Sequence, residues 1–376
     1  MFTYCNKTHF DTMMKTIDDA EATKIANYLS TNNTYSKLSL SLQHIKSFGA
    51  KSIGELLSKN TALTIISLYR NKIGNEGATA IAESLKYNKT LTNIYLGSNN
   101  ICTDGVIAFA DALKYNNTLK NLDLRNSYFH RDGAAAFAVT LAQNNTIQKL
   151  NFNGAHIYND GIIILADGLK NNRSIVKIQL GSNYIEDDGA IALSKVLVNH
   201  PSITNIRLHD NQITNTGAIK LFNAQEFNPK ITDLDLRYNY IGFVGCMVFA
   251  NIIKQNKTIQ TIYLSGNCIE DTVVDALCIA FKQNTTVQEV RLNKNNISNI
   301  GLFAIAEMLK ENKTIKYMHL QSNELIGKLG VQKLVSELKE NKTIKDFKVY
   351  NNILNYRLLN SLASGDYRIV PNDPSF

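Results

Sequence analysis

The residues of this chain that could do chemistry do not fall into a catalytic or metal-binding pattern. The seven histidines are scattered without an HExxH spacing, and there is no GxxxxGK[ST] phosphate loop and no GxSxG nucleophile motif. The five cysteines are widely separated and form no CxxC pair, which favours reduced thiols over a zinc or disulfide framework. We therefore expect a protein that is not an enzyme and that uses no cofactor or metal.

Arginines, tyrosines and other polar residues instead recur at a fixed spacing in the second half of the chain. The equally spaced positions 207, 235, 263, 291 and 319 carry Arg, Asp, Tyr, Arg and His. Tyrosine and arginine are typical anchors of protein interfaces, so this row predicts a partner-binding surface. The predicted binding residues are Arg207, His209, Asp235, Arg237, Tyr238, Tyr263, Arg291 and His319. Two alternatives stay open: the row consists of exposed strand residues, with Arg207 paired to Asp235, or binding uses a loop edge or the helix ends.

The fixed spacing is that of a repeat. The segment that begins at Leu63 (LTIISLYRNKIGNEG) returns at Leu91 (LTNIYLGSNNICTDG), which sets the period at 28. Repeats begin at positions 35, 63, 91, 119, 147, 175, 203, 231, 259, 287, 315 and 344, with one inserted residue before the last. Residues 35–354 thus hold eleven full repeats and part of a twelfth. Residues 1–34 are expected to form a degenerate capping repeat, and residues 355–376 a C-terminal cap and tail. The segment 353–364 should cover the last repeat with Leu354, Leu358, Leu359 and Leu362.

Each repeat predicts one short strand and one helix. The Leu-x-Leu pair alternates as a strand with one buried face does, and the segment after the next turn has apolar residues at helical spacing. Strands are expected to begin near 38, 66, 94, 122, 150, 178, 206, 234, 262, 290, 318 and 347. An asparagine at the ninth position should bond to neighbouring backbone. Ser127 and Ala155 replace it in two adjacent repeats, where we expect local loosening or bound water.

The pattern LxxLxLxxNxIxxxG resembles the leucine-rich repeat of the ribonuclease-inhibitor type, a group that includes the Ran GTPase-activating protein and the sensor regions of NOD-like receptors. The resemblance implies an α/β leucine-rich repeat solenoid, a horseshoe with an inner parallel β-sheet and outer α-helices. It also implies a protein-binding scaffold that recognises its partner through the concave strand face. The analogy gives an alternative, a GTPase-activating protein for a small GTPase, although this chain ends with few acidic residues.

The net charge of +8 raises the question of nucleic-acid binding. Many of the lysines occupy one repeat position near the expected helix C-terminus, where a cation complements the helix dipole. These lysines are Lys86, Lys114, Lys170, Lys254, Lys282, Lys310 and Lys339. We therefore expect no nucleic-acid partner. The Asn-x-Thr sequons at 88, 116, 144, 256, 284, 312 and 341 likewise follow the repeat, and we expect no glycans on them.

The cellular location is predicted from two sequence features that were looked for and not found, a signal peptide and a membrane-spanning segment. The first ten residues resemble no signal peptide, and no apolar run reaches the ~18 residues that span a bilayer. We expect a cytoplasmic monomer that is not inserted in a membrane and that binds a protein of unknown identity. The alternative is a bacterial effector that reaches a host cytosol without a conventional signal peptide.

Overall fold

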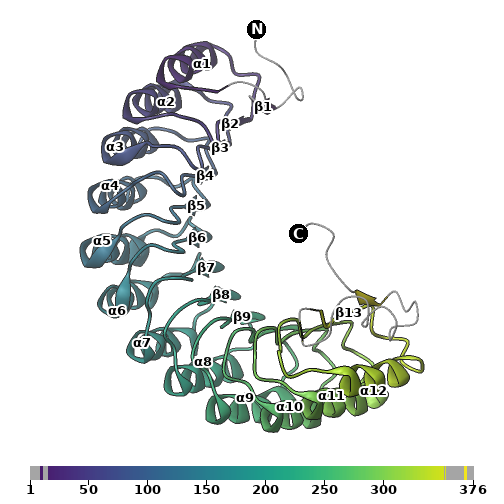
Figure 1. Cartoon of the computed structure of the whole chain (residues 1–376). Coiled ribbons are helices and arrows are strands. Elements are labelled where there is room, and N and C mark those ends of the chain that lie inside the picture. Colours follow the sequence, from purple (N-terminus) through teal and green to yellow (C-terminus); the bar gives the residue numbers. More distant parts are fainter. Residues whose placement is uncertain (1–8, 12–15, 351, 353–367, 371–376) are drawn as a thin grey trace. The chain divides into compact units, whose positions relative to one another are not determined.

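A computed structural model describes residues 9–11, 16–350, 352 and 368–370 (Figure 1). The chain divides into two compact units. The N-terminal unit comprises residues up to 185 together with 200–203, and the C-terminal unit comprises 186–199 and the residues from 204 onward. The four leucines of the predicted C-terminal cap, between 354 and 362, lie outside the described residues.

In the N-terminal unit, short strands and helices alternate along the chain. The strands are β1 (His9–Asp11), β2 (Lys37–Ser39), β3 (Ile65–Ser67), β4 (Asn93–Tyr95), β5 (Asn121–Asp123), β6 (Lys149–Asn151) and β7 (Lys177–Gln179). The helices are α1 (Asp19–Thr31), α2 (Ser47–Lys59), α3 (Gly74–Leu85), α4 (Thr103–Leu113), α5 (His130–Gln143) and α6 (Tyr158–Leu169). Neighbouring strands pair in parallel and in chain order, and paired residues such as Ile66 and Ile94 occupy the same position of successive repeats.

The C-terminal unit repeats this arrangement. Its strands are β8 (Asn205–Arg207), β9 (Asp233–Asp235), β10 (Thr261–Tyr263), β11 (Glu289–Arg291), β12 (Tyr317–His319), β13 (Asp346–Lys348) and β14 (Ile369–Val370). Its helices are α7 (Asp187–Leu197), α8 (Asn215–Phe227), α9 (Phe243–Gln255), α10 (Asp271–Gln283), α11 (Asn299–Glu311) and α12 (Lys328–Leu338). All strand pairs in this unit are parallel, and the inserted residue shifts the register once, so that Met318 pairs with Phe347.

The hydrophobic core lies between the strand layer and the helix layer of each unit. The central residue of each strand and the apolar stripe of each helix point into it, as with Ile66, Ile94, Ile81 and Leu85, all 0% exposed. Each strand from β2 to β13 begins one residue before the predicted position. The predicted α/β leucine-rich repeat solenoid is therefore confirmed.

Two asparagine ladders connect successive repeats. At the ninth position, Asn99 donates to the carbonyls of Leu68 and Leu96, at 2.8 and 2.7 Å. The sequon asparagines form the second ladder, in which Asn88 donates to the Leu57 carbonyl at 2.8 Å and accepts from the Leu91 amide at 2.7 Å. The sequon side chains thus hold backbone groups of neighbouring repeats, and most of them are buried.

The repeats that lack the ninth-position amide are closely packed. The ring of Phe129 lies 5.4 Å from that of Phe137 and 4.5 Å from that of Phe152, between ring centroids. The Ala155 amide donates to the Asn183 side chain at 3.0 Å. Aromatic rings fill this part of the core, but the Ser127 hydroxyl is buried with no partner among the described residues, so local loosening or bound water stays a prediction.

Strand β1 and helix α1 begin the described part of the solenoid, and β1 pairs with β2. Asp18 caps α1 by accepting from the Glu21 amide at 3.0 Å, and Asp19 accepts from the Lys46 and Gly49 amides of the next repeat at 2.6 and 3.0 Å. The apolar face of the helix is buried, as is Ile17 just before it; the residues of this face are Ala22, Ile25, Ala26 and Leu29. These contacts support the proposal that residues 1–34 cap the solenoid.

Deleting residues 1–34 is expected to lower the melting temperature or to cause aggregation, because α2 would lose its apolar cover. Circular dichroism during heating and light scattering measure the two effects. Unchanged melting and solubility would show that the cap is dispensable.

Candidate functional site on the strand face

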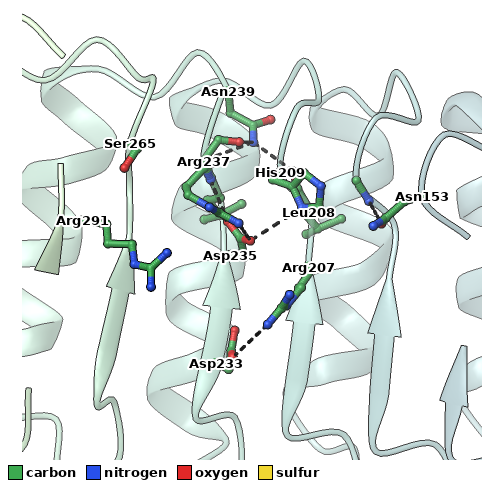
Figure 2. Close-up of polar contacts among 12 residues, drawn as sticks. Asn153, Arg207, Leu208, His209, Asp233, Asp235, Arg237, Asn239, Ser265 and Arg291 are labelled. Carbon is green, nitrogen blue, oxygen red and sulfur yellow. Dashed lines mark hydrogen bonds and ion pairs between the residues drawn. The ribbon is translucent and has the colours of Figure 1, made fainter. Parts of the chain in front are cut away.

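The predicted binding residues lie on one face of the C-terminal unit, at or just after strands β8 to β12. Side chains alternate along a strand, so the residues that flank a buried leucine or isoleucine point away from the helices. Arg207, Asp235, Tyr263, Arg291 and His319 end these five strands. We call this surface the strand face of the C-terminal unit; Figure 2 shows its central part.

Asp235 is the central acceptor of this face. Its side chain is 1% exposed, and its carboxylate accepts from Nε and Nη2 of Arg237 at 2.8 and 2.6 Å (Figure 2). Nδ1 of His209 lies 3.6 Å from the same carboxylate. The bidentate bond to Asp235 raises the pKa of Arg237 above its ordinary value. Asp235 therefore fixes the direction of the Arg237 guanidinium.

The alternative in which Arg207 pairs with Asp235 is not what the structure shows. Arg207 instead lies 4.0 Å from Asp233, at the other end of strand β9 (Figure 2). The physical reason is that Arg237, two residues after Asp235, already bonds to both carboxylate oxygens.

Tyr263 lies against two guanidinium groups. The Cζ atoms of Arg237 and Arg291 are 5.3 and 5.2 Å from the centre of its ring, within the range of a cation–π contact. Arg291 is held in addition by Glu289, with Nε 2.5 Å from the carboxylate. Burial raises the pKa of the Tyr263 hydroxyl, so the ring is uncharged near neutral pH. Each arginine is thus fixed by an acidic residue of its own strand and by one shared ring.

The two histidines of the face are less basic than usual. Burial lowers the pKa of His209 and of His319, and the nearby Asp235 and Asp346 offset only part of this effect. Nε2 of His319 lies 3.3 Å from Asp346, on strand β13. Both histidines therefore offer mainly neutral polar groups to a partner near pH 7.

Tyr238 lies beyond the end of strand β9 and is 42% exposed. A Cβ added to Gly266, in the next repeat, would overlap its ring, so this glycine makes room for the ring. Nζ of Lys294 lies 5.4 Å from the ring centre on the following repeat. A tyrosine, a glycine and a cation thus follow one another at the same position of three repeats.

Comparison with known proteins bears on the repeats of the chain. A family model described as leucine-rich repeat matches residues 59–82, 87–110, 171–194, 227–250, 255–278 and 283–306. This chain is therefore a protein built of leucine-rich repeats. Among curated proteins, none matches its sequence. A solved structure, Leiomodin-1 Actin-Binding Site 2 (ABS2), is similar at 19% identity over 40% of this chain and 87% of that chain, with a TM-score of 0.33.

The lysines of this leucine-rich repeat protein lie where the sequence predicts them. Lys86, Lys114, Lys170 and Lys339 directly follow their helices, whereas Lys254, Lys282 and Lys310 lie in the last helical turn. Several pair with acidic residues, as Lys282 does with Glu311 at 2.7 Å. Within the described residues, no helix is long and apolar enough to cross a membrane, and no cluster of side chains could hold a metal ion.

Sequence reasoning missed several residues of the strand face. Asp233 and Glu289 orient the arginines from the first position of their strands. Ser265 is 3% exposed, and its hydroxyl has no partner among the described residues. The sequence contained a signal for one further group. The triplet Asp-Leu-Arg that begins at Asp235, the last residue of β9, also occurs at Asp123–Arg125, where it builds a similar cluster in the N-terminal unit.

Proposed function

We propose that this leucine-rich repeat protein is a non-enzymatic protein-binding scaffold that recognises its partner through the strand face of the C-terminal unit. The observation that carries the proposal is the pair of arginines, Arg237 and Arg291, held on the ring of Tyr263. Arginines fixed in this way lose little conformational entropy when a partner binds. Tyr263 and its two arginines therefore have the properties of interface anchors.

Replacing Tyr263 or Arg237 by alanine should weaken partner binding by about 1–3 kcal/mol, because each change removes an anchor and releases the arginines. A partner captured from cytosolic extract and identified is then titrated with the purified variants by calorimetry. Tyr240→Ala is the matched control, since Tyr240 belongs to the same unit and is 61% exposed but lies outside the strands. Equal losses from Tyr240→Ala and Tyr263→Ala would contradict the proposal.

The repeat pattern supports a more specific assignment of the family. We propose a repeat of the ribonuclease-inhibitor type with a period of 28, supported by one helix per repeat and by the strand register, in which Ile66 pairs with Ile94. We also propose that the protein is a cytoplasmic monomer; the alternative location is a host cytosol, where it would act as a bacterial effector.

The alternative activity is stimulation of GTP hydrolysis by a small GTPase. It is tested by measuring GTP hydrolysis with and without the protein, and the scaffold proposal expects no acceleration.

A further inference from the structure

The strand face of the N-terminal unit carries a second cluster of arginines on a tyrosine. The Cζ atoms of Arg70 and Arg125 each lie 5.4 Å from the centre of the Tyr69 ring. Arg125 follows strand β5 and Tyr69 follows strand β3, so the contact reaches across the intervening repeat. This cluster consists of described residues of one unit and is separate from the predicted site.

Gly97 makes this long contact possible. It occupies, in the repeat between them, the position that Tyr69 and Arg125 occupy in theirs, and a Cβ there would lie 2.5 Å from Cγ of Arg125. The arginine side chain therefore lies over the glycine backbone. Any larger residue at 97 would push it away from the Tyr69 ring.

Asp123 holds the Arg125 side chain in place. Its carboxylate is 4% exposed and accepts from Nε of Arg125 at 2.9 Å, and it also bonds to Nη2. Nδ2 of Asn151 donates to the same carboxylate at 3.2 Å. The bond to Asp123 raises the pKa of Arg125 above its ordinary value. Because Asp123 is buried and already bonded, the Arg125 guanidinium remains the group that meets a partner.

The charges of this face are unbalanced. Strands β2 to β7 and the three residues after each contain one acidic residue, Asp123, and five basic ones. The basic residues are Lys37, Arg70, Arg125, Lys149 and Lys177. On the C-terminal unit, by contrast, Asp233, Asp235, Glu289 and Asp346 each lie within 4.0 Å of a basic side chain. The strand face of the N-terminal unit therefore favours an anionic partner.

We propose that this face binds an acidic protein segment, with carboxylates of the segment on the guanidinium groups of Arg125 and of Arg70 and an apolar side chain beside Tyr69. A carboxylate matches the planar donors of arginine better than it matches a lysine. Nucleic acid is disfavoured, because helix-end lysines such as Lys86 and Lys114 pair with acids of their own helices at 2.7 and 2.6 Å. No basic stripe formed by these lysines therefore continues the face.

The test uses a fluorescein-labelled peptide with four glutamates around one phenylalanine, and the same peptide with glutamines. Fluorescence anisotropy with the full chain at ~0.1 M salt measures the dissociation constant. Arg125→Gln is expected to weaken binding of the glutamate peptide by about tenfold. Gly97→Ala keeps every charge and is expected to weaken binding about threefold or more, because its Cβ displaces Arg125. The glutamine peptide is expected to bind at least tenfold more weakly than the glutamate peptide.

Arg131→Gln is the matched control for net charge, since Arg131 is exposed at the start of α5 and outside the strand face. It is expected to change binding less than twofold. Equal losses from Arg131→Gln and Arg125→Gln would overturn the proposal, because they would indicate attraction by net charge alone. Tighter binding of a labelled oligothymidine, lost in Arg125→Gln, would overturn it in favour of nucleic acid. Because every variant lies in the N-terminal unit, the outcome is separate from that for Tyr263.

Discussion

Replacing Asn99 by alanine is expected to lower the free energy of unfolding by about 3–5 kcal/mol. Asn99 is 0% exposed, and it donates to the Leu68 and Leu96 carbonyls while accepting from the Asn71 amide at 3.1 Å. Alanine would leave these backbone groups buried without partners. Each such group costs about 1–3 kcal/mol, and part of this cost is relieved by relaxation.

Urea unfolding followed by circular dichroism measures this loss. Asn117→Ala serves as the control, because Asn117 belongs to the same repeat and is exposed; we expect a change below about 0.5 kcal/mol. If Asn99→Ala were as mild as Asn117→Ala, the asparagine ladder would not be a main source of stability.

The substitution His200→Asn is expected to make the protein more stable in mild acid. His200 occupies the place of an asparagine in the second ladder: Nδ1 accepts from the Ile203 amide at 3.1 Å, as the Asn172 side chain accepts from Ile175 at 2.8 Å. Burial lowers the pKa of His200 to about 4, and the Leu169 carbonyl, which favours the protonated ring, offsets only part of this effect. Protonation in the folded state would also remove the acceptor at Nδ1.

The direction of the pH dependence follows from the lowered pKa. Between pH ~6.5 and 4 the unfolded chain binds a proton at His200 and the folded chain does not, so stability is lost as the pH falls. At pH 5 this loss amounts to about 2 kcal/mol, and His200→Asn removes it. The variant should be close to the natural protein at pH 7.5.

Urea unfolding of both proteins at pH 7.5 and pH 5 provides the measurement. His44→Asn is the control, because His44 is exposed and makes no ladder contact in the described residues. The explanation fails if the natural protein and His200→Asn lose the same stability between the two pH values.

The repeat explains why so much of the fold could be predicted from the sequence. Each Leu-x-Leu pair and each helical stripe recurs at one spacing, so a single interpretation placed every strand between β2 and β13. Ion pairs depend on which side chain lies nearest to a carboxylate, and Arg237 rather than Arg207 bonds to Asp235. The repeat spacing alone does not predict which of two arginines pairs with a given carboxylate.

The cluster on Tyr69 was not predicted as a binding site, although its members recur at the repeat spacing. Its key position is Gly97, which acts by having no side chain and therefore gives no positive signal to a search for functional residues. Alignment of the repeats places Tyr69, Gly97 and Arg125 in one column. Reading each column for a small residue between an aromatic ring and a cation would have found both this cluster and that of Tyr238, Gly266 and Lys294.

The central claim is that a partner binds the strand face of the C-terminal unit and not the helix ends. The most direct test measures the affinity of one identified partner for two sets of single variants. The first set is Tyr263→Ala and Arg237→Ala, and the second set is Lys254→Glu and Lys282→Glu. We predict a loss of about 1–3 kcal/mol in the first set and little change in the second, since these lysines lie in the last turns of helices α9 and α10. Loss of affinity in the lysine set alone would contradict the claim.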